Sequence, residues 1–258
     1  MGMRLDGQRA IVTAGAGGAG LVIAQTLAGQ GATVFVGDID SEAVVALPDG
    51  LFGTVVDVSE PDDVRRWLSP IVEDGIDILV NNAGIAGPTQ PVEDITPEEW
   101  RRCIAVGLDS QYLCAREVVP TMKETGEGSI VNIASTAGYM GMPYRAPYVA
   151  AKFGVVGLTK TLAMELGRAG IRVNAIAPGS IVGDRMDRVV AAQAATDGLA
   201  ISEVEAMYTQ GVSLARFIDP QEIADMVLYL CSPQARSISG QVIGIDGNTE
   251  TLYPRPLS

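Results

Sequence analysis

A tyrosine and a lysine four residues apart, Tyr148 and Lys152, are the side chains of this sequence best suited to moving a proton. On a helix, residues four apart share one face, so the ammonium would lie close to the phenol. A phenol, with a reference pKa near 10, is a poor base at neutral pH, but a neighbouring cation favours its ionised form. Such a pair can take a proton from an alcohol or return it to a carbonyl oxygen. Taken alone, however, such a pair is usually just packed and solvated.

Ser135 adds a hydroxyl directly after the apolar segment 129–134. A serine there can hydrogen-bond a substrate oxygen and fix its position, although serines after strands are more often turn or cap residues. The sequence contains no histidine, which excludes Ser-His-Asp and Cys-His catalysis and most zinc sites. The three cysteines show no metal-ligand spacing, so we expect core thiols, a reducing compartment and no metal site; they are Cys103, Cys114 and Cys231.

A glycine-rich turn spans residues 13–20, between a predicted strand and a predicted helix. Glycines let a backbone approach a pyrophosphate closely, and the free N–H groups of a helix N-terminus favour its charge. We expect Gly15, Gly18 and Ala19 to contact the phosphates. Asp38 ends the next predicted strand, where a carboxylate accepts from a ribose 2′-hydroxyl and repels a 2′-phosphate. Since no arginine or lysine lies in the turn or beside Asp38, the sequence predicts NAD rather than NADP as cofactor.

The elements that must position these residues form an alternating pattern of strands and helices. Because the apolar segments are β-branched and nearly continuous, they predict parallel strands buried on both faces. The sequence therefore predicts an α/β fold, a doubly wound Rossmann-type sheet in a single domain over residues 1–258. We expect strands at 9–13, 33–37, 51–56, 76–80, 129–134, 171–177 and 241–246, and helices from the turn to about 28, from 97 to about 123, at 146–166 and at 220–230.

One long irregular stretch, roughly 179–214, follows the sixth predicted strand. Ligands bind beyond the carboxyl ends of such strands, so we interpret this stretch as a substrate lid. The alternative is a surface excursion without a role.

The composition limits the partners. The chain has 258 residues, of which 47% are hydrophobic and 19% charged, which excludes a disordered chain. A formal net charge of −13 argues against nucleic acid and anionic membranes as partners. The start of the sequence lacks the apolar region of a signal peptide, and no apolar run is long enough to span a bilayer. We therefore expect a cytoplasmic location.

Several motifs together resemble those of the short-chain dehydrogenase/reductase family, in the family's order and over nearly the whole chain. The glycine-rich turn, residues 148–152 as Tyr-x-x-x-Lys and Ser135 thirteen residues earlier are three of them. The others are Asp57-Val58, which resembles the pair that meets adenine, Asn81-Asn82-Ala83-Gly84 after the fourth predicted strand, and Pro178-Gly179, which in the family covers the nicotinamide.

The resemblance implies reversible hydride transfer between NAD and an alcohol/carbonyl pair. It implies that Ser135, Tyr148 and Lys152 are catalytic, and that Tyr148, Lys152, Asn82 and Gly84 also meet the cofactor. It further implies seven parallel strands in the order 3-2-1-4-5-6-7 and a homo-oligomer, either a dimer or a tetramer, joined through the long helices and the last strand.

Three positions depart from the family pattern. Ala14 stands where the first glycine of the turn is expected, and the extra glycines at 15 and 17 can compensate. Gly183 stands where a threonine often holds the cofactor's carboxamide, so we expect the backbone to hold it, for example at Ile181. Gly107 replaces the family's fourth catalytic residue, an asparagine that supports a proton-relay water. Our hypothesis is that glycine leaves room for solvent in its place.

The substrate is the least determined feature. Three arginines flank the expected pocket and suit an anionic group, although pairing with Asp184 or Asp187 is the plainer interpretation; they are Arg145, Arg185 and Arg188. We expect a polar hydroxy compound such as a polyol, sugar or hydroxy acid, with an apolar alcohol such as a hydroxysteroid second. A sensor or scaffold that binds NAD without turnover is the alternative function. Tyr139 and Tyr144 are interpreted as pocket lining or packing, and Trp67 and Trp100 as core residues.

Overall fold

Seven parallel strands form one sheet in the order β3-β2-β1-β4-β5-β6-β7, as the family resemblance implies. The computed structural model describes residues 3–252, apart from the side chains of residues 184–185, 192–193 and 196–197. The strands are β1 (Arg9–Thr13), β2 (Thr33–Asp38), β3 (Leu51–Val55), β4 (Ile78–Asn81), β5 (Gly128–Ile133), β6 (Ile171–Pro178) and β7 (Val242–Ile245).

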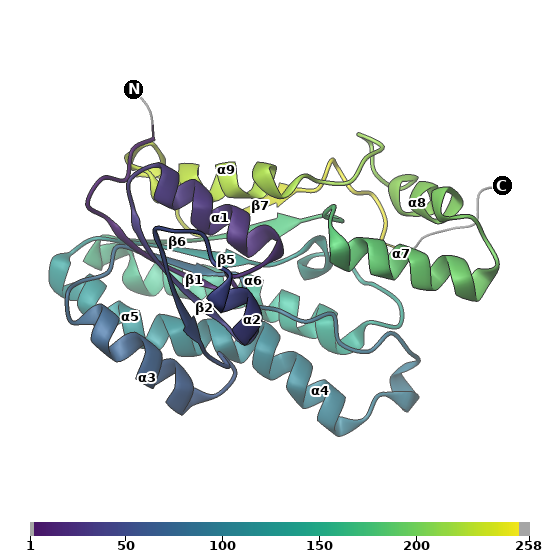
Figure 1. Ribbon diagram of the computed structural model, residues 1–258, viewed down its shortest axis with the longest axis horizontal. Helices are drawn as coiled ribbons and strands as arrows, with labels where there is room; N and C mark the ends of the chain where they lie inside the picture. Colours follow the sequence, from purple (N-terminus) through teal and green to yellow (C-terminus); the bar gives the residue numbers. More distant parts are fainter. Residues whose placement is uncertain (1–2, 253–258) are drawn as a thin grey trace.

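Helices cover both faces of the sheet (Figure 1). On one face, α1 and α9 pack against each other and the strands; on the other lie α3, α5 and the end of α6. The helices are α1 (Gly18–Gly29), α2 (Ser41–Val45), α3 (Pro61–Val72), α4 (Pro97–Ile104), α5 (Ser110–Thr125), α6 (Ala146–Leu166), α7 (Asp184–Asp197), α8 (Ile201–Thr209) and α9 (Pro220–Cys231). Short 3₁₀ turns are η1 (Val92–Asp94), η3 (Thr136–Gly138), η4 (Gly167–Ala169) and η5 (Pro233–Ala235).

The central strands are apolar throughout because both of their faces are buried. In β1, Ala10 and Val12 belong to the core under α1 and α9, whereas Ile11 belongs to the core under α3 and α5. All three side chains are fully buried. Burial stabilises the fold by about 1.5–3 kcal/mol for each Val or Ile side chain. This two-sided burial places the ends of β1, β4 and β5 rigidly side by side, at the edge where the candidate site lies.

The predicted helix from 97 to about 123 is interrupted. Between α4 and α5 the chain forms a π-helix, η2 (Ala105–Asp109), with Gly107 at its centre. A π-helix inserts an extra residue into the turn and often occurs at functional sites. The sequence pattern predicted one uninterrupted helix and did not reveal this insertion.

The expectation of an irregular stretch at 179–214 was wrong, because α7 and α8 occupy most of it. The two helices pack on each other around Val190, Ala194 and Val204, and they project beside the sheet (Figure 1, green). Neither N-cap residue, Gly183 or Ala200, has a side chain that can cap the helix, although Glu203 accepts the backbone N–H of Ala200 at 2.7 Å. This lack of cap residues concealed both helices from sequence reasoning.

No helix within residues 3–252 combines the length and apolar character that crossing a bilayer requires.

Candidate active site

The glycine-rich turn joins the end of β1 to α1, as the sequence predicts. Gly17 and Gly18 are exposed, and a Cβ atom added at either would have no neighbour within 4 Å. Gly15 is buried against Val36, while Ala19 lies in the first turn of α1. The turn therefore presents bare backbone to open space at a helix N-terminus, which fits the pyrophosphate of a dinucleotide.

Ala14 has a φ of +49°, in the left-handed region that favours glycine. The sequence suggested that the neighbouring glycines compensate for its side chain. That compensation concerned cofactor binding and stays a prediction; the φ of Ala14 adds a strain of its own, because the position adopts a conformation that favours glycine.

Asn82 fastens the turn to β4. Its side-chain Nδ2 donates to the carbonyl oxygens of Thr13 and Ala14 at 3.1 and 3.0 Å. Its backbone N–H and that of Ala83 both donate to the Thr13 hydroxyl, at 2.9 and 3.0 Å. Gly20 packs against this junction, where a Cβ would lie 2.6 Å from Asn82 Nδ2 and overlap the carbonyl of Ala14. Sequence reasoning missed the roles of Thr13 and Gly20, although both lie within the motif.

Asp38 ends β2 beside the turn, where its Oδ2 accepts the backbone N–H of Ala16 at 3.0 Å. Its Oδ1 accepts the backbone N–H of Asp40 at 3.1 Å. The carboxylate is partly buried and lies at the strand end where a ribose would be held.

Asp57 lies beyond β3, one strand further along the same edge. Burial by itself would raise its pKa, but hydrogen bonds from Ser59 and the charge and hydrogen bond of Arg102 together lower it. The neighbouring side chain of Val58 is only 7% exposed and belongs to the core. Asp57 is thus an ionised acceptor at the outer end of the candidate cofactor site.

Lys152 is buried on α6, with 4% of its surface exposed. Its Nζ donates to the carbonyl of Ile133 at 2.8 Å and lies 5.9 Å from the centre of the Tyr148 ring. Burying an ammonium is costly unless it is hydrogen-bonded, so this bond holds the charge in place. A Cβ at Gly84 would lie 3.4 Å from the same Nζ, and the missing side chain therefore keeps the space beside the ammonium open.

Ser135 follows β5 two residues after the carbonyl that holds Lys152. Its Oγ accepts the backbone N–H of Ala137 at 3.1 Å, which caps η3. The cap interpretation of this serine is therefore correct, but it does not conflict with the catalytic one. An oxygen that accepts a hydrogen bond still carries a proton that can be donated to a substrate.

Arg145 contacts the same tyrosine from the start of α6. Its guanidinium carbon lies 5.1 Å from the centre of the Tyr148 ring. The guanidinium also donates to the carbonyl of Ala86 at 2.9 Å and to the Thr89 hydroxyl at 3.3 Å, both in the loop after β4. Of the three arginines in the predicted cluster, the Arg185 side chain lies outside the described residues and Arg188 is exposed on α7.

Gly107 is buried at the centre of η2, and the hypothesis that solvent takes the place of the asparagine stays a prediction. A Cβ at this position would lie 3.1 Å from the Cβ of Ala151, the residue before Lys152. Glycine here permits η2 to approach α6 closely, which explains its presence in the interior of a helix.

The stretch after β6 begins with a β-bridge and a glycine of positive φ. Ile181 forms a bridge with Ile218, and Gly183 has a φ of +132° at the start of α7. The bridge gives the backbone near the predicted carboxamide contact a defined position.

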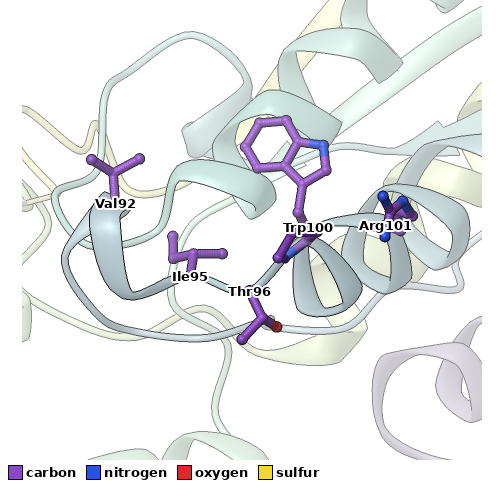
Figure 2. Close-up of a pocket in the computed structure, with 6 residues that line it drawn as sticks. Val92, Ile95, Thr96, Trp100 and Arg101 are labelled. Carbon is purple, nitrogen blue, oxygen red and sulfur yellow. The ribbon is translucent and has the colours of Figure 1, made fainter.

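The structure places one of the two tryptophans in the core and the other at the surface, whereas the sequence predicted both in the core. Trp67 is buried against Gly37, but Trp100 is 40% exposed, so its assignment to the core was wrong. Trp100 borders a surface pocket of about 270 Å³ between α4 and the preceding loop (Figure 2). Tyr139 donates from its hydroxyl to Asp246 Oδ2 at 2.6 Å. Its phenol therefore has a structural partner at the end of β7.

Comparisons with known proteins agree with this geometry. A family model described as enoyl-(acyl carrier protein) reductase matches residues 14–248. The chain is similar to a D-beta-hydroxybutyrate dehydrogenase of Rhizobium meliloti, at 34% identity over 92% of this chain and 96% of that protein. It is also similar to the 3-oxoacyl-[acyl-carrier-protein] reductase FabG of Thermotoga maritima, at 37% identity over 95% and 98%.

A solved structure of levodione reductase superimposes with a TM-score of 0.89 at 33% identity, covering 97% of this chain and all of that one (100%). Fold, family match and relatives thus lead to one conclusion. The chain belongs to the short-chain dehydrogenase/reductase family and is an oxidoreductase that acts on alcohol and carbonyl groups with a nicotinamide cofactor.

Proposed function

We propose that this protein is an NAD-dependent dehydrogenase that interconverts a secondary alcohol and its ketone in a small polar hydroxy compound, with Ser135, Tyr148 and Lys152 as catalytic residues. The observation that carries the proposal is the buried ammonium of Lys152, held by the carbonyl of Ile133 beside the Tyr148 ring. A buried cation fixed next to a phenol stabilises the phenolate, the form that can accept a proton.

When bound, the cofactor supplies the hydride acceptor for oxidation or the hydride donor for reduction. The residues of the chain orient the substrate and transfer the proton. The hydroxyl of Ser135 donates a hydrogen bond to the substrate oxygen and so orients the substrate. Tyr148, as the phenolate, takes the hydroxyl proton of the alcohol as the carbonyl forms. In reduction, Tyr148 returns a proton to the same oxygen, while the charge of Lys152 stabilises the phenolate that remains.

The cofactor fits the residues that line the edge of the sheet. Gly15, Gly18 and Ala19 would hold the pyrophosphate, and Asp38 would accept from the hydroxyls of the adenosine ribose. A carboxylate at this point repels a 2′-phosphate, which supports NAD over NADP. The remaining contacts we propose are Asp57 and Val58 at adenine, Asn82, Gly84, Tyr148 and Lys152 along the nicotinamide half, and Ile181 at the carboxamide.

Arg145 supports a substrate that carries an anionic group near the reacting hydroxyl. Its charge lies 5.1 Å from the ring of Tyr148, so a carboxylate attached close to the carbinol would be attracted to this side of the site. Among polyols, sugars and hydroxy acids, this geometry favours the hydroxy acids. The similarity to a hydroxybutyrate dehydrogenase points the same way.

The substrate would be enclosed by α7 and α8, which we propose as the lid over residues 179–214 within a single domain. The two helices have a small core of their own and are joined to the body by short bridges at Ile181–Ile218 and Val212–Thr249. Such a unit can move without disturbing the main core.

We also propose a cytoplasmic homo-oligomer, either a dimer or a tetramer. Large apolar side chains on α5 and α6 are exposed in the single chain, which suits helix packing between subunits; they are Tyr112, Phe153 and Met164. The cysteines are all buried free thiols, which suits a reducing compartment.

The test incubates the protein with a panel of hydroxy acids, polyols, sugars and hydroxysteroids, each with NAD and with NADP. Absorbance at the nicotinamide band measures the rate of oxidation. We expect NAD-dependent oxidation of at least one polar compound, best for a hydroxy acid. Tyr148→Phe should lower kcat by about 10²-fold or more with NAD binding retained. Tyr229→Phe, on the opposite face of the sheet, is the control. Equal rates with NADP, or an active Tyr148→Phe variant, would overturn the proposal, and NAD binding without any turnover would favour a sensor.

A further inference from the structure

Asp57 is held by a closed network that joins two distant segments of the chain. The Ser59 hydroxyl donates to Asp57 Oδ1 at 2.6 Å, and Arg102 Nη2 donates to Asp57 Oδ2 at 3.1 Å. Arg102 Nη1 also donates to the Ser59 hydroxyl at 2.6 Å, which closes the network. Arg102 lies on α4, which begins well beyond the end of β4, whereas Asp57 and Ser59 lie between β3 and α3.

This contact differs from the other arginine pairs on nearby helices. Arg65, Arg66 and Arg101 each pair with a carboxylate three residues earlier in the same helix, and all of these pairs are largely exposed. Exposed pairs of this kind contribute little. Arg102 instead reaches another element, and the side chain of Asp57 is only 23% exposed. The guanidinium holds both the carboxylate and its neighbouring hydroxyl, a geometry that fixes orientation as well as charge.

The network lies at the end of the candidate cofactor site that is farthest from Tyr148. Asp38 and Asp57 follow the adjacent strands β2 and β3, which pair in parallel as far as Asp38 and Val55. The backbone N–H of Val56 donates to the carbonyl of Asp38 at 2.8 Å. A group attached to a ribose at Asp38 would therefore lie next to Asp57. In a dinucleotide that group is adenine.

We propose that Arg102 is a positioning residue for the adenine half of the cofactor, acting through Asp57. Arg102 and Ser59 hold the Asp57 carboxylate ionised and in one orientation, which leaves it able to accept from the exocyclic amino group of adenine. An amino group donates only to a suitably directed acceptor, so fixing the carboxylate favours binding by removing an entropic cost. The inference rests on the proposed binding of NAD and adds α4 to the elements that select the cofactor.

The experiment measures the dissociation constants of NAD and of nicotinamide mononucleotide, which lacks the adenosine half. Arg102→Gln should weaken NAD binding by about fivefold to twentyfold and leave the mononucleotide unchanged. The kcat at saturating NAD should not change, because the Arg102 guanidinium contacts Asp57 and Ser59 rather than the proposed catalytic residues. Arg102→Lys should recover part of the loss, since it keeps the charge but not the planar fork.

Arg101→Gln is the matched control, because Arg101 is the adjacent arginine of α4 and its ion pair among the described residues is with Glu98 of the same helix. Figure 2 shows Arg101 next to Trp100 on α4, among the residues that line the surface pocket. Its removal should change neither dissociation constant. If Arg101→Gln weakens NAD binding as much as Arg102→Gln, the effect reflects general loss of positive charge and the inference is wrong.

Two further outcomes would overturn the inference. Tighter NAD binding by Arg102→Gln would mean that Arg102 competes with adenine for Asp57. An equal loss of affinity for NAD and for the mononucleotide would mean that the substitution damages the fold. If wild-type protein fails to bind NAD at all, the proposed function fails instead, so the two failures are distinguishable.

Discussion

Replacement of Gly20 by alanine should destabilise the fold, because this glycine is the point where α1 meets the turn and Asn82. The new methyl group would lie 2.6 Å from Asn82 Nδ2 and overlap the carbonyl of Ala14. Neither neighbour can move freely. The carbonyl belongs to the backbone, and the amide is held by hydrogen bonds to Thr13 and Ala14 at 3.1 and 3.0 Å.

The magnitude follows from three contributions. Overpacking costs about 1–3 kcal/mol, and the two hydrogen bonds of Asn82 that must break or stretch contribute about 0.5–1.5 kcal/mol each. Alanine returns about 1 kcal/mol through its higher helix propensity. We therefore expect the free energy of unfolding of Gly20→Ala to fall by about 3 kcal/mol.

Gly17→Ala is the matched control in the same turn. A Cβ at Gly17 has no neighbour within 4 Å, and the residue has an extended backbone with a φ of −153°. Its loss of stability should not exceed about 1 kcal/mol, the cost of alanine at a helix N-cap. Binding of NAD should nevertheless weaken, because the methyl group occupies the open space expected for the pyrophosphate.

The assay is urea unfolding followed by circular dichroism at one protein concentration, together with NAD titration of each folded variant. A fixed concentration matters because an oligomer gains stability by mass action. If Gly20→Ala unfolds at the wild-type urea concentration, the packing argument is wrong. If Gly17→Ala binds NAD as tightly as the wild type, the turn does not hold the pyrophosphate.

Three other changes have defined outcomes. Ala14→Gly should raise the free energy of unfolding by about 0.5–1 kcal/mol, since it relieves the φ of +49° but adds freedom to the unfolded chain; urea unfolding measures this, and a loss of stability would contradict it. Burial and the hydrogen bond to Asp246 raise the pKa of Tyr139 above its usual value. The contribution of Tyr139 to the free energy of unfolding is complete below about pH 10 and is lost as the pH rises further. The free energy of unfolding, measured in urea between pH 8 and 11, should therefore decline less for Tyr139→Phe than for the wild type. Gly107→Asn should destabilise the fold by about 1–3 kcal/mol without raising kcat, because the side chain meets Ala151 at 3.1 Å; a many-fold faster variant would restore the asparagine relay as the better explanation.

Local patterns in the sequence were sufficient for the sheet and for the motifs that surround the site. Continuous β-branched segments predict buried parallel strands whatever their neighbours are. The glycine-rich turn and the spacing of Tyr148 and Lys152 depend on residues close together in the chain, so they too can be recognised without coordinates. The strand order, by contrast, came from the family resemblance, and the structure bears it out.

Only the tertiary structure decided which distant residues meet. No pattern in the sequence joins Arg102 to Asp57, Arg145 to Tyr148 or Gly107 to Ala151, because each contact depends on how separate helices and loops pack. The helices α7 and α8 escaped prediction because they bury only a small core of their own and have glycine and alanine at their N-cap positions. The sequence by itself therefore determined the chemistry this protein carries. Packing decided how each of those groups is held, because the free energy of packing depends on contacts between segments far apart in the chain.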